Sequence, residues 1–367
     1  MQSDNIRLSL TGIDPLVAVE LLDIFGCATN LFSLTAEEII ARTRFKEKDI
    51  KKLFDIVAQE RLVEEQEFIK RFSIDTYVIG DDNYPSTLST IQDAPPILYS
   101  KGALDLSQAN EKWIAIVGTR KCSNYGVTAT EQIVAEIASE HPDAVIVSGL
   151  AYGIDSYAHR FALKYGLKTV AVVAHGLDMI YPSDHRDLAR KIIESGGAII
   201  TEHPSKTTIT RYSFLKRNRI IAGISSGLIL SESPERGGSL FTANLADEYG
   251  RDVFAFPART IDKSFAGNIK LLSDRKAHLL LSVEDIQREM VWQKDEITSA
   301  PKSFNSIILS ENEQVILDLF VDNNCYAADE LIQSSNLSPA KIMSILTALE
   351  LKGLIRSVKG KMYVKCL

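Results

Sequence analysis

Residues 113–120 read Trp113-Ile114-Ala115-Ile116-Val117-Gly118-Thr119-Arg120, an apolar run that ends abruptly at a small polar loop. Three similar runs follow: 145–147 leads into Ser148-Gly149-Leu150-Ala151-Tyr152-Gly153-Ile154-Asp155, 169–173 into Ala174-His175-Gly176-Leu177-Asp178, and 227–230 into Ser231-Glu232-Ser233. Such β-branched runs without polar alternation are typical of strands covered on both faces, as in a parallel sheet between helix layers. Ligands of these folds bind beyond the carboxyl ends of the strands. The loops therefore predict a phosphate-binding rim, at which glycines let a ligand approach the backbone and helix N-termini offer free N–H groups.

Composition sets limits on the class of protein. The chain has 367 residues, of which 45% are hydrophobic and 24% charged, as in globular proteins of two or three domains. We expect a cytoplasmic protein, because we find no signal-peptide pattern and no apolar run long enough to span a membrane. The four cysteines are far apart, so neither a zinc site nor a disulfide framework is expected, and no other cofactor is indicated. The net charge of −7 argues against indiscriminate coating of nucleic acid but allows a local basic groove.

The chain divides into four expected parts. Residues 1–75 have helical periodicity, and Thr35 with Glu38 forms a capping-box pattern. Residues 76–290 alternate strands with helices, which predicts a doubly wound, mostly parallel sheet with helices over 126–140, 155–165, 184–194, 214–224 and 239–249. Residues 291–305 are expected to form a polar linker. Residues 306–367 are expected to form a winged helix, with helices over 311–323, 327–334 and 340–352 and a hairpin over 354–364.

Several side chains in this pattern could bind or react. Arg120 follows the first core strand and is suited to bidentate phosphate binding, although it could instead close a surface ion pair. The surrounding loop has no G-x-G-x-x-G, which disfavours a nicotinamide enzyme. Asp155 and His159 lie one helical turn apart and could form an acid–base pair, but a helix cap and a structural imidazole are the favoured interpretation.

A basic segment stands out because 203–231 contains no acidic residue. It carries cations interleaved with aromatics, the composition of a single-strand-binding surface: Lys206, Arg211, Tyr212, Phe214, Lys216, Arg217 and Arg219. Arg217 and Arg219 are expected on different faces of one helix, so that one reaches the ligand and the other holds Asn218 or a carboxylate. The glycine turn at 235–243 then completes a ring of four loops.

Taken together and in order, these motifs resemble the DNA processing protein A family, also called Smf. The quoted loops carry the resemblance, together with Tyr181-Pro182, Arg217-Asn218-Arg219, Gly238-Ser239-Leu240-Phe241-Thr242-Ala243 and the lead-in segments Tyr84-Pro85 and Pro95-Pro96-Ile97-Leu98-Tyr99. It covers about 80–285, and the helical start and winged-helix end fit the family's additional domains, the first of them similar to a SAM or helix-hairpin-helix domain. Two departures are Leu215-Lys216 in place of a proline and Asp274-Arg275-Lys276-Ala277 in place of a Gly-Ala pair, the latter in a candidate dimer interface.

The resemblance implies an extended Rossmann-like domain that binds single-stranded DNA, forms a homodimer and helps to load the RecA recombinase during natural transformation, without established catalytic activity. By this analogy Arg120 grips phosphate, and the Tyr181-Pro182 loop and the Arg217-Asn218-Arg219 helix line the groove. The expected single-strand-binding residues are Gly118, Thr119, Arg120, Ser148, Gly149, Gly153, Gly176, Tyr181, Pro182, Lys216, Arg217, Asn218, Arg219, Gly238, Ser239 and Thr242, with Asp155 and His159 in auxiliary structural roles.

Two other readings stay open. One is a LOG-type nucleotide phosphoribohydrolase on the same kind of sheet, although Gly237-Gly238-Ser239-Leu240-Phe241-Thr242 lacks the second part of its G-G-x-G-T-x-x-E motif. Release of ribose 5-phosphate from nucleoside monophosphates would support that enzyme. The other is an interaction scaffold in which the winged helix docks a partner, and deletion of 300–367 would separate that role from the groove.

Overall fold

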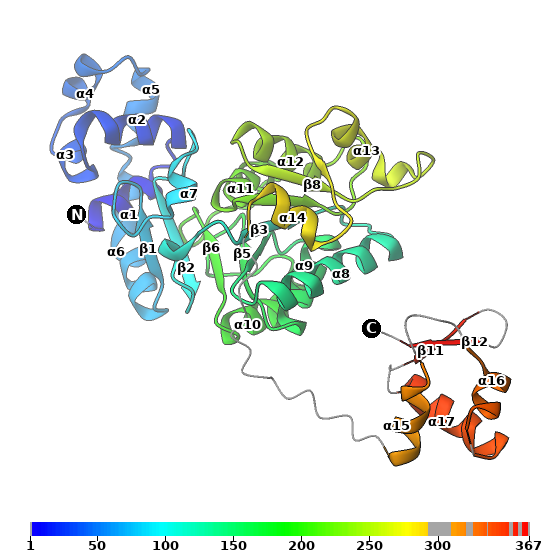
Figure 1. The fold of residues 1–367 in the computed structure, drawn as a ribbon. Helices are drawn as coiled ribbons and strands as arrows, with labels where there is room; N and C mark the ends of the chain where they lie inside the picture. Colours follow the sequence, from blue (N-terminus) through cyan, green and yellow to red (C-terminus); the bar gives the residue numbers. More distant parts are fainter. Residues whose placement is uncertain are drawn as a thin grey trace. The chain divides into compact units, whose positions relative to one another are not determined.

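The computed structural model describes residues 2–292, 310–320, 326–335, 337–351, 355–358 and 362–365. The chain forms two compact units, Met1–Asp295 and Glu296–Leu367, here called the first and second units (Figure 1). Most of the expected linker, 293–305, lies outside the described residues. Among the helices in the described ranges, none is both long and apolar enough to cross a membrane.

A nine-stranded sheet forms the centre of the first unit, in the order β1-β2-β6-β5-β4-β3-β7-β8-β9. The strands are β1 (Asp75–Val78), β2 (Ile97–Gly102), β3 (Trp113–Val117), β4 (Val145–Ser148), β5 (Lys168–Val172), β6 (Ala198–Thr201), β7 (Gly227–Leu230), β8 (Asp252–Ala255) and β9 (His278–Leu279). The pairs from β6 to β9 are parallel, and β1 and β2 add an antiparallel edge. The doubly wound, mostly parallel sheet predicted from the sequence is confirmed.

The strand order reverses next to β3. From β3 the chain moves outward through β4, β5 and β6, and it then returns to place β7 on the other side of β3. Ala115 of β3 accordingly lies opposite Val147 of β4 on one side and Leu228 of β7 on the other. Such a reversal separates the loops that follow the two neighbouring strands and opens a crevice at their carboxyl ends.

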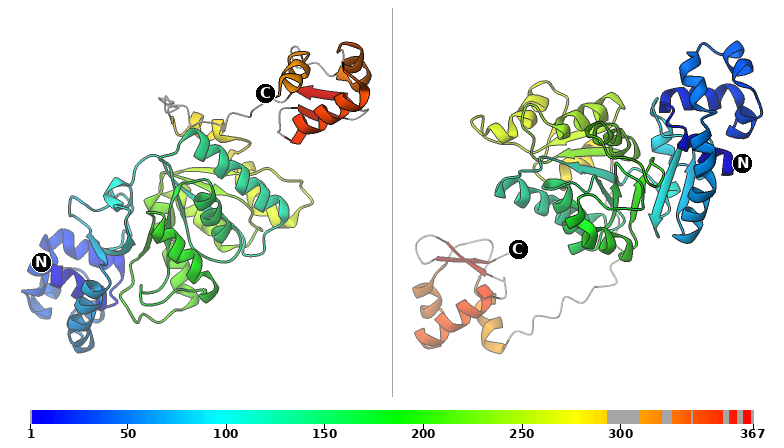
Figure 2. Two further views of the ribbon diagram at one scale, coloured as in Figure 1. Left: turned by 90° about the horizontal axis from the view of Figure 1, so that it is seen from below. Right: turned by 180° about the vertical axis from the view of Figure 1, so that it is seen from behind.

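Alternate side chains of the central strands enter two separate cores, which explains their unbroken apolar sequences. Ala115, Val147 and Leu228 pack in a core with residues of α11 and α12, whereas Ile114 and Ile116 pack in a second core with residues of α8, α9 and α14. Figures 1 and 2 show the helices on both faces of the sheet. The helices that follow β1 are α7 (Ser86–Ser89), α8 (Asn124–Glu140), α9 (Ile154–Lys164), α10 (Arg186–Glu194), α11 (Arg211–Ile224), α12 (Gly238–Glu248), α13 (Ala266–Ser273) and α14 (Val283–Glu289).

The five predicted helices of this region correspond to α8 to α12, with one informative shift, whereas α7, α13 and α14 were not predicted. α11 begins at Arg211 instead of 214, because Thr210 caps it: its hydroxyl accepts a hydrogen bond from the Ser213 amide at 3.1 Å. A capping hydroxyl satisfies an amide that has no partner within the helix. The extra turn brings Arg211 to the carboxyl-end crevice.

Six helices precede the sheet: α1 (Gln2–Leu10), α2 (Pro15–Phe25), α3 (Ala28–Phe32), α4 (Ala36–Arg42), α5 (Glu47–Lys52) and α6 (Ile56–Arg71). The predicted capping box is present at α4, where Glu38 accepts from the Thr35 amide at 2.8 Å. α6 is anchored to the sheet domain by Glu65, which is 1% exposed and accepts from the Ser205 amide at 2.9 Å. Arg61, one turn earlier, donates to the Ser205 carbonyl at 2.6 Å, so the loop that precedes α11 is held from both sides.

The second unit contains α15 (Glu311–Asp318), β10 (Tyr326–Ala327), α16 (Ala328–Gln333), α17 (Pro339–Leu351), β11 (Ile355–Val358) and β12 (Met362–Lys365). Its three strands pair in the order β10-β12-β11, and Ile316, Ile342 and Leu346 are completely buried between its helices. The predicted three helices and hairpin of a winged helix are confirmed. α15 ends at Asp318, and residues 321–323 of the expected helix lie outside the described residues.

Candidate functional site

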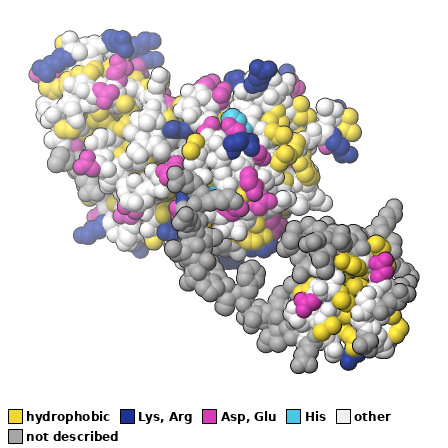
Figure 3. Space-filling model, viewed as in Figure 1, with side chains coloured by type: hydrophobic (Ala, Val, Ile, Leu, Met, Phe, Trp, Pro, Cys, Tyr) yellow, Lys and Arg dark blue, Asp and Glu magenta, His cyan; other side chains and the backbone are white. Residues whose placement is uncertain are grey.

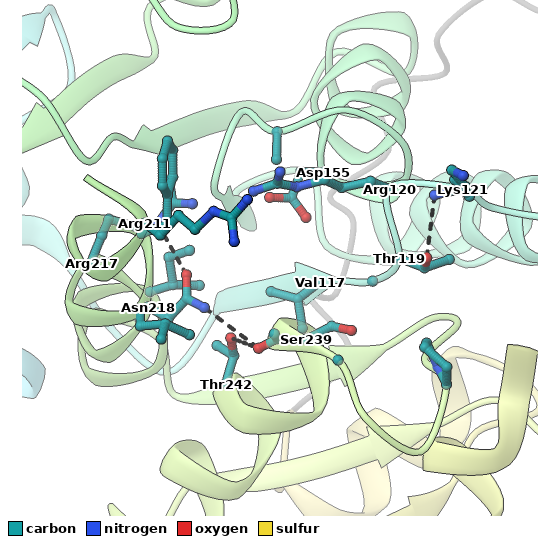
Figure 4. Close-up of a pocket in the computed structure, with 18 of the residues that line it drawn as sticks. Val117, Thr119, Arg120, Lys121, Asp155, Arg211, Arg217, Asn218, Ser239 and Thr242 are labelled. Atoms are coloured by element: carbon teal, nitrogen blue, oxygen red, sulfur yellow. Dashed lines mark hydrogen bonds between the residues drawn. The ribbon is translucent and has the colours of Figure 1, made fainter. Parts of the chain in front are cut away.

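A cleft of about 730 Å³ lies at the carboxyl ends of the central strands, where the strand order reverses. Its walls come from the loop after β3, the first turns of α9 and α11, and the loop that leads into α12 (Figure 4). The lining residues are Val117, Gly118, Thr119, Arg120, Lys121, Ala151, Asp155, Tyr181, Arg211, Phe214, Leu215, Arg217, Asn218, Ile221, Pro234, Arg236, Gly237, Gly238, Ser239 and Thr242. Three of the four predicted loops therefore contribute to one site, and the loop after β5 reaches it through Tyr181.

The loop after β3 is fixed by its backbone, which leaves its cationic side chains exposed. The Thr119 amide donates to the Glu232 carbonyl at 2.7 Å, and this ties the loop to the one after β7. The Lys121 amide donates to the Thr119 hydroxyl at 3.2 Å. Arg120 and Lys121 are consequently presented by a loop that is already ordered, which lowers the entropic cost of holding an anion.

Two glycines of the loop after β4 serve contacts within the protein. Gly153 has φ +75°, and a Cβ there would lie 2.3 Å from the Thr119 carbonyl oxygen. A Cβ at Gly149 would lie 2.6 Å from an oxygen of Asp155. At Gly153 the positive φ and the nearby backbone oxygen require glycine, whereas the atoms close to Gly149 belong to side chains. Gly153 therefore lets the loops after β3 and β4 touch each other, and Gly149 leaves room for the side chains of Asp155 and Arg217. That these glycines also let a ligand approach stays a prediction.

Arg217 is the buried cation at the base of the cleft, with 4% of its surface exposed. Its Nη1 donates to the carbonyls of Gly149, at 2.7 Å, and Val172, and its Nε donates to Asn218 Oδ1 at 3.1 Å. Burial lowers its pKa to about 10, which leaves the guanidinium charged at neutral pH. The side chain lines the cleft, but its bonds connect three elements of the fold, so its first role is structural.

Asp155 shares this buried environment. Burial raises the pKa of the carboxyl, while the nearby Arg217, the backbone amide of Ala151, Arg120 and the backbone amide of Gly149 act to lower it. The charges of Asp155 and Arg217 offset each other, as a buried carboxylate requires. Asp155 is the second residue of α9, whose N-cap is Gly153, so it does not form the helix cap expected from the sequence; its carboxyl instead lies near Arg217.

Within the described ranges the cleft's remaining cations form no ion pair, although Arg120 also acts to lower the pKa of the buried Asp155. Arg120, Lys121, Arg211 and Arg236 line it and are exposed. Throughout the described ranges, no carboxylate forms an ion pair with any of these four side chains. Elsewhere acidic and basic side chains are interspersed, as on the face of the first unit in Figure 3, in keeping with the net charge of −7. The positive charge of the cleft is thus local and available to an anion.

Two aromatic rings stand among these cations. Tyr181, 46% exposed, lies 5.7 Å from the ring of Phe214, and the Arg120 guanidinium lies 5.6 Å from the same Phe214 ring. Tyr181 is held in place because its amide donates to His175 Nε2 at 3.1 Å; the peptide bond to Pro182 is cis. Exposed rings beside cations can stack on bases while the cations bind phosphates.

The first turn of α12 forms the opposite wall. Gly237 caps this helix without a side-chain bond, so the amides of its first turn have no partner within the helix. The hydroxyls of Thr242 and Ser239 are already donated, to the Gly238 carbonyl and to the Ser233 hydroxyl, both at 2.9 Å. This wall therefore offers an anion its backbone amides. Its hydroxyls are left only as acceptors and do not serve an anion.

Several residues expected at the site lie elsewhere. Ser148, Gly149, Gly176 and Pro182 are buried outside the cleft lining, and Gly153 is half-buried beneath the loop after β3. Arg219, 5% exposed, forms ion pairs with Glu202 and Asp93 on the other face of α11, as the two-residue spacing predicted. Lys216 contacts Asp14 at 3.6 Å. Conversely, Lys121 and Arg236 line the cleft but were not predicted to do so. Their positions shortly after the strands β3 and β7 could have indicated them.

His159 is completely buried, with Nδ1 2.7 Å from the Thr169 hydroxyl, which itself donates to the Ile146 carbonyl. It therefore donates from Nδ1 and lies outside the cleft lining, in agreement with a structural role. Burial lowers its pKa to about 3, with smaller effects of His185 and Arg217.

This shift predicts a pH-dependent stability. The imidazole of the unfolded chain titrates near pH 6.5, so the stability that depends on a neutral His159 is fully present above that pH. As the pH falls from about 6.5 towards 3, the contribution of His159 to the free energy of unfolding should decrease by about 1.4 kcal/mol per pH unit. Urea titrations at pH 7.0, 6.0 and 5.0 test this. His159→Gln should lose this part of the slope, and His278→Gln, at a half-buried histidine, should keep it. An unchanged slope in His159→Gln would show that His159 is not buried in its neutral form.

Comparisons with known proteins agree with this architecture. Residues 75–291 match the model of the family described as DNA recombination-mediator protein A, and residues 300–361 match the DprA winged helix domain. The DNA processing protein DprA of Streptococcus pneumoniae is 40% identical over 214 residues, covering 58% of this chain and 73% of the relative. The protein Smf of Escherichia coli is 32% identical over 282 residues, covering 76% of this chain and 74% of the relative.

Solved structures give the same result. The crystal structure of the Streptococcus pneumoniae protein superposes with a TM-score of 0.66 at 34% identity, covering 78% of this chain and 97% of that one. A structure of DNA processing protein A from Helicobacter pylori, concerned with its single-stranded DNA binding mode, gives a TM-score of 0.53 at 29% identity, covering 60% of this chain and 96% of that one. With a family model that spans the sheet and a second that spans the winged helix, this chain belongs to the DNA processing protein A (DprA/Smf) family.

Proposed function

We propose that this protein binds single-stranded DNA without sequence preference in the cleft at the carboxyl ends of β3, β4 and β7. One observation carries the proposal: four exposed cations without an ion-pair partner among the described residues line the same cleft as the exposed ring of Tyr181 and the half-buried ring of Phe214. The cations suit a phosphate backbone, and the rings suit unpaired bases. The Helicobacter pylori relative, with its single-stranded DNA binding mode, supports the same assignment.

A single strand fits this arrangement better than a duplex does. The Tyr181–Phe214 pair lies inside the cleft, among the cations. Stacking on these rings requires bases that are not already stacked and paired in a helix. Every base has a π-face, so such stacking tolerates any sequence.

The Arg120→Ala variant should bind single-stranded DNA about fivefold more weakly, as expected for loss of one exposed ionic contact. Its slope of log K against log salt should be shallower by about 0.7, because one phosphate contact fewer releases fewer counterions. Fluorescence anisotropy with mixed-sequence single-stranded and duplex oligonucleotides over a salt series measures both quantities. The matched control is Lys168→Ala, which removes an exposed cation at the amino end of β5. An unchanged slope for Arg120→Ala would contradict its role in phosphate binding.

We further propose that the protein acts in the cytoplasm as a homodimer that delivers the bound strand to the RecA recombinase during transformation or recombination. Membership of the family supports these roles. We assign no catalytic function to the cleft, because Asp155, its one lining carboxylate among the described residues, is buried next to Arg217. Asn244, where the phosphoribohydrolase motif would need a carboxylate, donates to the Leu240 carbonyl at 2.9 Å.

A further inference from the structure

A second hollow, of about 680 Å³, adjoins the cleft on the far side of the loop after β3. It is lined by Arg120, Lys121, Cys122, Tyr152, Gly153, Ser156, Tyr157 and Arg160. Arg120 and Lys121 line both hollows, so the two meet at this loop. On the α9 side of the second hollow, only Gly153 was suggested by the sequence as a site residue.

The α9 side of this hollow is basic. Ser156, Tyr157 and Arg160 lie on one face of α9, since positions one turn apart share a face. Arg160 is exposed, and among the described residues no carboxylate forms an ion pair with it. The lining contains three cations, Arg120, Lys121 and Arg160, and no acidic side chain. No acidic side chain of the lining would therefore repel an anionic ligand; Asp184, outside the lining, accepts a hydrogen bond from Tyr152.

Two tyrosines of the hollow are held by neighbouring groups. Tyr152 is 45% exposed; its hydroxyl donates to Asp184 at 2.8 Å and its ring meets His185 edge-on, with centroids 5.0 Å apart. Tyr157 stacks on Phe161 with centroids 5.7 Å apart. An ordered ring gives a base a stacking surface at little entropic cost. The hollow thus repeats the composition of the cleft, cations beside aromatics.

We propose that a single strand bound in the cleft continues over the Arg120–Lys121 loop into this hollow, where Arg160 binds a backbone phosphate and Tyr152 and Tyr157 contact bases. The proposal rests on the proposed function and extends it, because it assigns the nucleotides next to those in the cleft a binding surface on α9. The protein should consequently bind a long oligonucleotide by a contact that a short one cannot make.

Binding of oligothymidylates in steps from about 4 to about 16 nucleotides, the range of known single-strand site sizes, tests the extension. The full chain, Arg160→Ala, Arg160→Lys and the control Lys168→Ala are compared by fluorescence anisotropy. The shortest oligonucleotide that binds should show equal affinity for all four proteins. At the longest, Arg160→Ala should bind about fivefold more weakly, with a salt slope reduced by about 0.7, and Arg160→Lys should retain most of the affinity.

The outcomes separate the two proposals. If the wild type binds no single strand of any length at low salt, the proposed function fails. If the wild type binds and Arg160→Ala matches it at every length, the extension alone is overturned. An equal loss for short and long oligonucleotides would also overturn the extension, because it would show a general effect of charge instead of a contact made only by the longer strand.

Discussion

Replacing Arg217 by Met is expected to lower the free energy of unfolding of the first unit by about 3 kcal/mol, the lower end of the cost of removing one partner of a buried charge pair. Methionine has a similar length but leaves the carboxylate of Asp155 buried without its neighbouring cation. It also leaves the carbonyls of Gly149 and Val172 without their donor. Urea unfolding followed by circular dichroism at pH 7 measures the loss.

The double variant Asp155→Asn/Arg217→Met is the control for this prediction. Removing both charges should be less destabilising than the sum of the single substitutions, because no uncompensated charge stays buried. Burial already raises the pKa of Asp155, so lowering the pH from 7 to 5 should reduce the deficit of Arg217→Met by protonating the carboxyl. Strictly additive effects would show that the two side chains do not interact. Arg217 is accordingly a poor probe of DNA binding, since any loss of affinity could reflect loss of structure.

The variant with Arg120, Lys121 and Arg211 all changed to Ala should bind single-stranded DNA about 100-fold more weakly than the wild type. Each of the three side chains is exposed in the cleft without an ion-pair partner among the described residues, so each can contribute a phosphate contact. The salt slope should be shallower by about 2, the sum of three contacts at about 0.7 each. The fold should be unaffected, because none of the three is buried.

A triple variant with the same change in net charge provides the comparison. Lys168, Arg190 and Lys191 are exposed and lie at the start of β5 and in the second half of α10. Changing these three to Ala should leave the affinity within about twofold of the wild type if binding depends on the local cluster. Equal weakening in both triple variants would mean that the overall field of the protein, and not the cleft, governs binding.

The sequence was most informative where local pattern and fold coincide. The unbroken apolar run of β3 indicated a strand with two covered faces, and the loop after it indicated Arg120 as a cleft residue; the structure shows both. The winged helix followed from the order of its helices and hairpin alone. These features depend on periodicity and strand ends, which are properties of short segments.

Which arginines of the basic segment are buried could not be predicted from such local patterns. Arg211, Arg217 and Arg219 belong to the same basic segment, yet Arg211 is exposed, Arg217 bonds the loop after β4 and the end of β5, and Arg219 is paired with Glu202. Their partners are distant in sequence, so the distinction appears only when the tertiary structure is known. The same holds for Gly149 and Gly153: the sequence of a glycine-rich loop does not tell whether its glycines make room for a ligand or for other parts of the protein.

The buried hydrogen bonds between Glu65 and Ser205 limit where the chain can be truncated and which N-terminal modules can replace its helices. The helices before β1 resemble an added module that could be exchanged or removed at residue 75. A chain that began there would lose the carboxylate that holds the Ser205 amide and hydroxyl, and the loop that leads into Arg211 would lose its anchor. A replacement module would have to supply an equivalent acidic side chain at the same place. The helical region is thus tied to the sheet domain by this bond. In an exchange of domains between relatives, retention of the Glu65–Ser205 pair should matter more than a cut at residue 75.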